Sequence, residues 1–102
     1  MKKIMLACAQ GVSTSLLVTK MKKAAADKGM EAEIWAVDYS SVGDRIGTFD
    51  VLLLGPQISY AFDEIKETVG DAAPVALIRQ IDYGRCNGAA VLEYALELME
   101  EK

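Results

Sequence analysis

The residues most able to do chemistry are a cysteine and the hydroxyl side chains that follow it within seven positions. Cys8 ends a short apolar run, and a glycine and three consecutive hydroxyl residues come after it: Gly11, Ser13, Thr14 and Ser15. A cysteine thiolate is a nucleophile, hydroxyl groups donate hydrogen bonds to phosphate oxygens, and glycine allows a tight turn. The spacing therefore predicts a nucleophilic cysteine beside a phosphate-binding loop.

A buried strand followed at once by a helix would position this loop. Residues Ile4–Ala7 form an apolar run without polar alternation, which is typical of a strand covered on both faces. Apolar residues then recur at helical spacing from Leu17 until Gly29 ends the pattern. The N-terminus of a helix holds anions and favours a thiolate over a thiol. From this pattern alone, however, Cys8 could equally be a small and inert core residue.

The rest of the chain alternates between strand and helix patterns. Apolar runs predict three further strands: residues 31–37 (a half-exposed edge strand), 50–54 and 74–78. Helical spacing of apolar residues predicts two further helices: residues 58–69 and 92–99. We expect a loop over residues 81–87 and room for one short helix within residues 38–49. Such alternation implies one α/β domain with a parallel sheet, which binds ligands at the carboxyl ends of its strands.

Composition excludes several functional classes. The chain has 102 residues and a net charge of −4, whereas nucleic-acid binders usually carry a basic face. It contains no His, so it offers no Ser-His-Asp or Cys-His catalysis, no His metal ligand and no phosphohistidine. Cys8 and Cys86 are too far apart for the close cysteine pairs of many metal sites, and the Cys8 loop has no carboxylate for Mg²⁺. We expect no metal and no cofactor.

The apolar content predicts a folded chain without a membrane segment. Hydrophobic residues make up 52% of the sequence, which favours a dense core over disorder. The longest aliphatic run, Val51–Leu54, is far shorter than the roughly 18–20 residues of a membrane span. The uncharged run Ile4–Cys8 is too short for a signal-peptide core. We expect a soluble cytoplasmic protein.

The spacing Cys-x5-Thr-Ser is similar to the Cys-x5-Arg-Ser loop of the low-molecular-weight tyrosine phosphatases. Thr14 occupies the position of their arginine. Without that bidentate clamp, both phosphate binding and stabilisation of the transferring phosphoryl group weaken. Such a loop suits a carrier of phosphocysteine better than a hydrolase, and a phosphatase-like enzyme remains the alternative.

Three segments carry a resemblance to a known family: residues 4–18 (IMLACAQGVSTSLLV), residues 51–60 (VLLLGPQISY) and residues 81–84 (IDYG), with Gly88 beyond them. They resemble the cysteine loop and two further signatures of the IIB components of the bacterial sugar phosphotransferase system, lactose/cellobiose (chitobiose) family. The likeness covers the whole chain. The chain departs from the family where Ala9-Gln10-Gly11-Val12 replaces the common Ser-Ala-Gly-Met or Ala-Ala-Gly-Met, and where Asn87-Gly88 replaces Asp-Gly.

The resemblance implies a fold and a mechanism. Residues 1–102 would form one EIIB-type domain, an open four-stranded parallel sheet in the order 2-1-3-4 with helices on both faces. Cys8 would accept a phosphoryl group from the phosphohistidine of a IIA partner and pass it to a β-disaccharide-type sugar held by the IIC membrane permease. The backbone and hydroxyl groups that would hold the phosphate belong to Ala9, Gln10, Gly11, Val12, Ser13, Thr14 and Ser15.

Other interpretations of the chain and of single residues stay open. The protein could be a regulatory binding module that transfers nothing, or a IIB component of the galactitol or ascorbate type. Gln57 could face the Cys8 loop or serve only as a polar residue at a helix start. Tyr60 and Tyr83 could belong to a partner surface or pack with their polar tips exposed; packing is favoured for Tyr60. Cys86 is interpreted as incidental.

Overall fold

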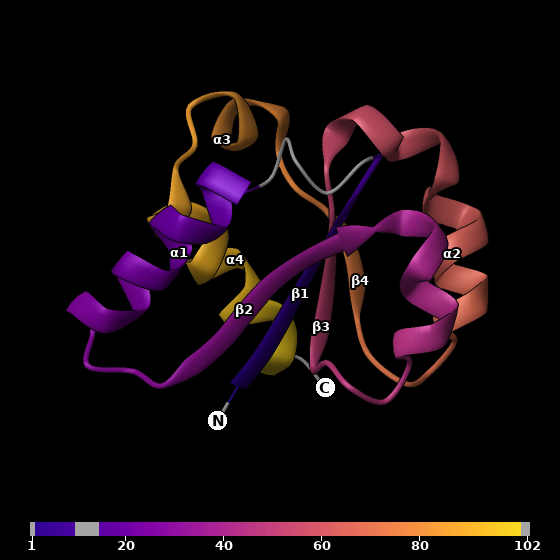
Figure 1. The fold of residues 1–102 in the computed structure, drawn as a ribbon, viewed down its shortest axis with the longest axis horizontal. Coiled ribbons are helices and arrows are strands. Elements are labelled where there is room, and N and C mark those ends of the chain that lie inside the picture. Colours follow the sequence, from indigo (N-terminus) through magenta and orange to yellow (C-terminus); the bar gives the residue numbers. More distant parts are fainter. Residues whose placement is uncertain (1, 10–14, 101–102) are drawn as a thin grey trace.

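The computed structural model describes residues 2–9 and 15–100, which fold around one four-stranded sheet (Figure 1). Every pair of neighbouring strands is parallel, and their order is β2-β1-β3-β4. The strands have these bounds: Lys2–Cys8 for β1, Ala32–Asp38 for β2, Val51–Leu54 for β3 and Val75–Leu77 for β4. The expected α/β class, the parallel sheet and its order are confirmed.

Helices cover both faces of this sheet (Figure 1). One face packs against α1 (Ser15–Asp27) and α4 (Gly88–Glu100). The other packs against α2 (Phe62–Val69) and two 3₁₀ segments, η1 (Tyr39–Arg45) and η2 (Pro56–Ala61). None of the helices within residues 2–9 and 15–100 is both long and apolar enough to cross a bilayer.

The central strand β1 divides the core into two parts. Side chains alternate along a strand, so Ile4 and Leu6 join the core beneath α1 and α4, whereas Met5 and Ala7 join the core beneath α2. All four are fully buried, as the apolar run predicts. Burying one large aliphatic side chain stabilises a fold by about 1.5–3 kcal/mol, so this strand anchors the sheet on both sides.

The helix expected over residues 58–69 is divided in two. Its first part is the 3₁₀ segment η2, and Ile58 has a non-helical backbone there with φ −114° and ψ 27°. The chain leaves β3 and must turn back along the sheet within these residues, and a 3₁₀ segment turns more tightly than an α-helix. The apolar positions of the pattern still face the core: Ile58, Ala61, Ile65 and Val69 are buried.

The loop expected over residues 81–87 is wrong for residues 81–84, where the chain forms the short helix α3 (Gln80–Gly84), and is confirmed for residues 85–87. None of the residues of α3 is fully buried, so this helix leaves no apolar stripe that a sequence pattern could reveal. The short helix expected within residues 38–49 is confirmed as η1. Its cap is Asp38, whose carboxylate accepts a hydrogen bond from the Ser40 amide at 3.1 Å.

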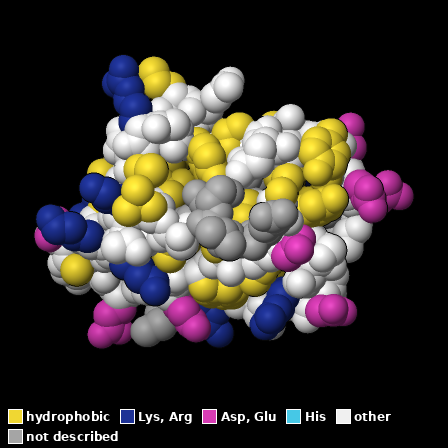
Figure 2. Space-filling view, turned by 45° about the horizontal axis from the view of Figure 1, so that its top comes forward, with side chains coloured by type: hydrophobic (Ala, Val, Ile, Leu, Met, Phe, Trp, Pro, Cys, Tyr) yellow, Lys and Arg dark blue, Asp and Glu magenta, His cyan; other side chains and the backbone are white. Residues whose placement is uncertain are grey.

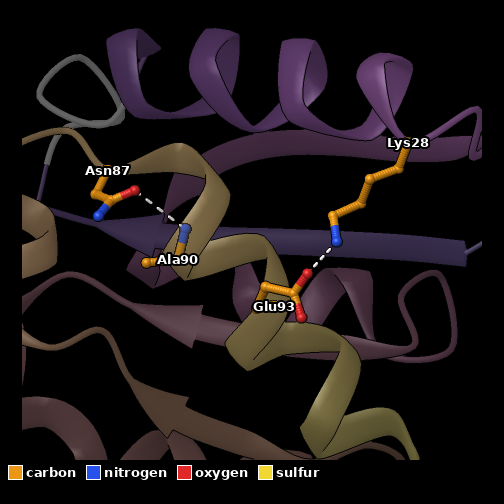
Figure 3. Close-up of polar contacts among 4 residues, drawn as sticks. All are labelled: Lys28, Asn87, Ala90 and Glu93. Atoms are coloured by element: carbon orange, nitrogen blue, oxygen red, sulfur yellow. Dashed lines mark hydrogen bonds and ion pairs between the residues drawn. The ribbon is translucent and has the colours of Figure 1, made fainter.

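The packing of α1 against α4 depends on a glycine. A Cβ atom at Gly88 would lie 2.4 Å from the Lys20 backbone carbon, so the two helices approach too closely for any side chain. Just before Gly88, the Asn87 side chain accepts a hydrogen bond from the Ala90 amide at 3.1 Å and caps α4 (Figure 3). An exposed ion pair also joins Lys28, in the turn after α1, to Glu93 of α4, but exposed pairs contribute little stability.

We expect Gly88→Ala to lower the free energy of unfolding by about 1–3 kcal/mol, because overpacking a close helix contact shifts backbone. Urea denaturation measures the change. Gly84→Ala is the matched control, since a Cβ at Gly84 meets no atom within 4 Å. Equal stability of the two variants would contradict the close-contact explanation.

Candidate functional site

Cys8 is the last residue of β1. It lies at the end of the sheet where the carboxyl ends of the parallel strands gather, which we call the carboxyl edge. The alternation that sends Ile4 and Leu6 toward α1 also directs the Cys8 side chain to that face. Helix α1 begins at Ser15 on the same face and at the same end of the sheet (Figure 1). Cys8 and the start of α1 therefore share a face and an end of the sheet, and the Cys8 side chain is fully buried, with 0% exposed.

The strands on either side of β1 bring further residues to this edge. Asp38 of β2 is the register partner of Cys8. On the other side, the Gly55 amide donates a hydrogen bond to the Ala7 carbonyl at 3.0 Å, so the end of β3 adjoins the residue before Cys8. The first and third strands are thus neighbours, and the segment Gly55-Pro56-Gln57 lies at the same edge as Cys8, as expected from the sequence.

Gln57 lies back over the end of β3. A Cβ atom at Gly55 would be only 2.5 Å from the Gln57 Oε1 atom, which shows how closely the amide covers that glycine. Its Nε2 atom donates a hydrogen bond to the Tyr83 hydroxyl of α3 at 2.7 Å. Gln57 thus begins a helical segment and also joins two segments at the edge, a contact that sequence spacing does not reveal.

A groove of about 810 Å³ lies between η2 and α3. Its walls carry no charged side chain among the residues that line it: Pro56, Gln57, Ser59, Leu77, Ile78, Gln80, Tyr83 and Gly84. The carboxyl edge on the β3 and β4 side is therefore concave and neutral.

Exposed apolar side chains surround the carboxyl edge (Figure 2). Leu16 at the start of α1 is 55% exposed, Tyr60 in η2 is 73% exposed and Ile81 in α3 is 60% exposed. We call these three residues the apolar rim. Tyr60 is too exposed for the packing with only its polar tip exposed that the sequence favoured. Large exposed apolar side chains that gather around a site are typical of an interaction surface.

Tyr60 nevertheless has an aromatic neighbour. Its ring meets that of Tyr39 edge to face, with the centroids 6.3 Å apart and the planes at 87°. A hydrogen bond with the Tyr60 side chain is the main cause that raises the pKa of Tyr39 above its ordinary value. The Tyr39 phenol therefore stays neutral at physiological pH.

Only part of the expected phosphate loop can be placed. Ala9 is exposed directly after β1, and Ser15 is exposed as the first residue of α1. The Ser15 carbonyl accepts a hydrogen bond from the Thr19 hydroxyl at 3.1 Å. The other expected phosphate-binding residues lie outside the described residues: Gln10, Gly11, Val12, Ser13 and Thr14.

Cys86 lies in the turn between α3 and α4. Cys8 and Cys86 form no disulfide, and Cys86 is half-buried. It has a φ of 50°, the left-handed conformation that non-glycine residues adopt infrequently. Apart from the pair Asn87-Gly88, no sequence pattern predicts this turn.

Comparisons with known proteins agree with one another. The family model described as "PTS system, lactose/cellobiose-specific IIB subunit" matches residues 3–94. The chain is 46% identical over 100 residues to the oligo-beta-mannoside-specific EIIB component of Bacillus subtilis (strain 168), covering 97% of each chain. It is 45% identical over 104 residues to the cellobiose-specific EIIB component of Lactococcus lactis, covering 96% of each chain.

Two further matches concern structure and chain organisation. The solution structure of a cellobiose-specific phosphotransferase IIB component protein from Borrelia burgdorferi superposes with a TM-score of 0.84 at 34% identity, covering 99% of this chain and 94% of that one. A lactose-specific EIICB component of Lactococcus lactis is 30% identical over 63 residues, which cover 62% of this chain and 11% of that protein.

We expect native alkylation by iodoacetamide to modify Cys86 before Cys8, because Cys8 is fully buried and Cys86 is half-buried. Peptide mapping after timed labelling measures both rates, with the unfolded chain as the reference for intrinsic reactivity. Faster labelling at Cys8 under native conditions would contradict the burial of its thiol.

Proposed function

The chain belongs to the lactose/cellobiose-specific IIB family of the sugar phosphotransferase system, and we propose that it works in the cytoplasm as that system's phosphocysteine carrier. Its family makes it a phosphotransferase-type component of sugar transport. The observation that carries the proposal is the position of Cys8, at the carboxyl end of the central strand and at the end of the sheet where α1 begins.

In the first step, the Cys8 thiolate attacks the phosphorus of a phosphohistidine on a IIA partner. The S–P bond forms while the N–P bond breaks, and the departing imidazole keeps the bonding electron pair and takes a proton. The chain has no His, so it needs a donor that supplies one. A helix N-terminus favours both the thiolate and the phosphate dianion that the step creates.

In the second step, a hydroxyl oxygen of the sugar attacks the phosphorus held on Cys8. The O–P bond forms, the S–P bond breaks, and the thiolate is restored while the hydroxyl proton leaves. Backbone amides and hydroxyl groups from Ala9 to Ser15 hold the phosphate between the two steps. Fixed hydrogen-bond donors of this kind stabilise the charge on a transferring phosphoryl group.

Both partners would dock on the apolar rim. The rim surrounds the edge at which Cys8 lies, and its residues come from three different segments. A cysteine that is fully buried in the free chain must be uncovered for transfer, and docking at its edge can supply that opening. The lactose-specific EIICB relative supports a close association with a IIC permease, since its name joins both components in one protein.

The sugar is proposed as a β-disaccharide type. Two relatives are 46% and 45% identical to this chain, and their names give different sugars, oligo-beta-mannoside and cellobiose. Selectivity for one sugar therefore belongs to the permease that binds it rather than to the carrier domain.

We expect Cys8→Ser to keep the fold and to lose phosphoryl acceptance from a phosphorylated IIA donor, because a serine hydroxyl is a much weaker nucleophile than a thiolate at neutral pH. Intact mass after incubation with enzyme I, HPr and candidate IIA proteins measures the gain of one phosphoryl group. Cys86→Ser is the matched control and should take up the group normally. Acceptance by Cys8→Ser would sink the proposal.

Polar substitutions in the apolar rim should weaken docking. We expect Leu16→Ser or Tyr60→Ser to raise the KM for the phosphorylated IIA donor about fivefold or more, which corresponds to the loss of about 1 kcal/mol shown by a contributing interface residue. Ile46→Ser provides the control, since Ile46 is also an exposed apolar residue but follows η1 on the way to the amino end of β3. An equal rise in KM for all three variants would refute a docking role for the rim.

A further inference from the structure

One hydrogen bond crosses the neutral groove at the carboxyl edge. The Nε2 atom of Gln57 donates it to the Tyr83 hydroxyl at 2.7 Å. It joins η2, which follows β3, to α3, which follows β4, although the two residues are 26 positions apart. The bond therefore connects two of the segments that carry the apolar rim.

Helix α3 is short and is held by few contacts among the described residues, one of which is the packing of the partly buried Tyr83 ring against the core beneath α1 and α4. It has five residues, far fewer than an isolated helix needs. Its N-cap, Arg79, makes no side-chain cap bond. Two contacts tie its surroundings to α4: the Arg79 guanidinium lies 5.6 Å from the Tyr94 ring centroid, and the Asn87 amide donates to the Asp82 carbonyl at 2.9 Å. The bond to Gln57 ties α3 on the opposite side, toward the groove.

Gln57 is itself held against the centre of the sheet. Its Oε1 atom lies so close to Gly55 that a Cβ atom there would be 2.5 Å away. The Gly55 amide in turn donates to the Ala7 carbonyl at 3.0 Å. Gln57, which donates the hydrogen bond to Tyr83, therefore contacts the end of β3 beside β1. Through this bond, α3 is connected to the two buried central strands of the sheet.

We propose that Gln57 and Tyr83 are positioning residues that hold α3, and with it the exposed Ile81, in place for partner docking. Ile81 precedes Tyr83 by two residues in a helix of little more than one turn, so any tilt of α3 moves the Ile81 side chain. The inference rests on the proposed function, because docking matters only if a partner delivers the phosphoryl group. Neither residue touches the phosphoryl group in this account.

The test uses Tyr83→Phe and Gln57→Met, which remove the bond and nearly keep the side-chain volume. Each single variant should raise the KM for the phosphorylated IIA donor about 3- to 10-fold, the value of one net hydrogen bond, while kcat stays nearly constant. The double variant should be no worse than Gln57→Met alone, because that substitution already removes the bond to Tyr83. Amide exchange at Arg85, which donates to the Ile81 carbonyl at 3.1 Å, should accelerate by a similar factor.

Gln80→Met is the matched control, since it makes the same chemical change in the same groove without removing the bond between Gln57 and Tyr83. The inference would be overturned if the KM increases of the two single variants multiplied in the double variant. It would also be overturned if amide exchange at Arg85 accelerated while the KM stayed unchanged. If the unaltered chain takes no phosphoryl group from any donor, the docking role falls with the proposed function. The exchange rates then still decide whether the bond holds α3.

Discussion

The burial of β1 on both faces is the constraint on which the rest of the structure depends. Because β1 lies between β2 and β3, its side chains must alternate between two cores, and this alternation decides that Cys8 shares a face with α1. The parallel pairing then gathers the ends of all four strands at one edge. The buried Cys8, the start of α1 and a neutral groove thus lie at the same end of the sheet.

The chemistry of the edge fits a carrier that must release what it accepts. The Cys8 thiol is fully buried in the free chain, which limits its contact with water and oxidants. The rim around it is apolar, and the groove beside it is neutral, so specificity for a partner can come from shape and from the burial of Leu16, Tyr60 and Ile81. The arginine that would drive hydrolysis in a tyrosine phosphatase loop is replaced by Thr14. In the proposed cycle, the partner both uncovers the thiol and excludes water during transfer.

The sequence predicts those features that depend on local patterns and misses those that depend on distant contacts. The apolar run of β1 and the spacing behind it predict a buried strand and a helix, and family resemblance supplies the strand order. The break at Ile58 and the helix α3 are missed, because a tight reversal and a short, half-buried turn leave no apolar period. The bond between Gln57 and Tyr83 joins residues that only the folded sheet brings together. The phosphate contacts of residues 10–14 stay predictions.

The central claim is that the phosphoryl group is carried by one sulfur atom. Phosphorus-31 NMR of the chain after phosphorylation by its IIA donor tests this most directly, because a phosphate bonded to sulfur and one bonded to oxygen resonate at different positions. The account predicts a single thiophosphate-ester signal that vanishes on addition of the IIC permease with its sugar. A phosphate-ester signal from Ser13, Thr14 or Ser15, or no bound signal at all, would contradict it.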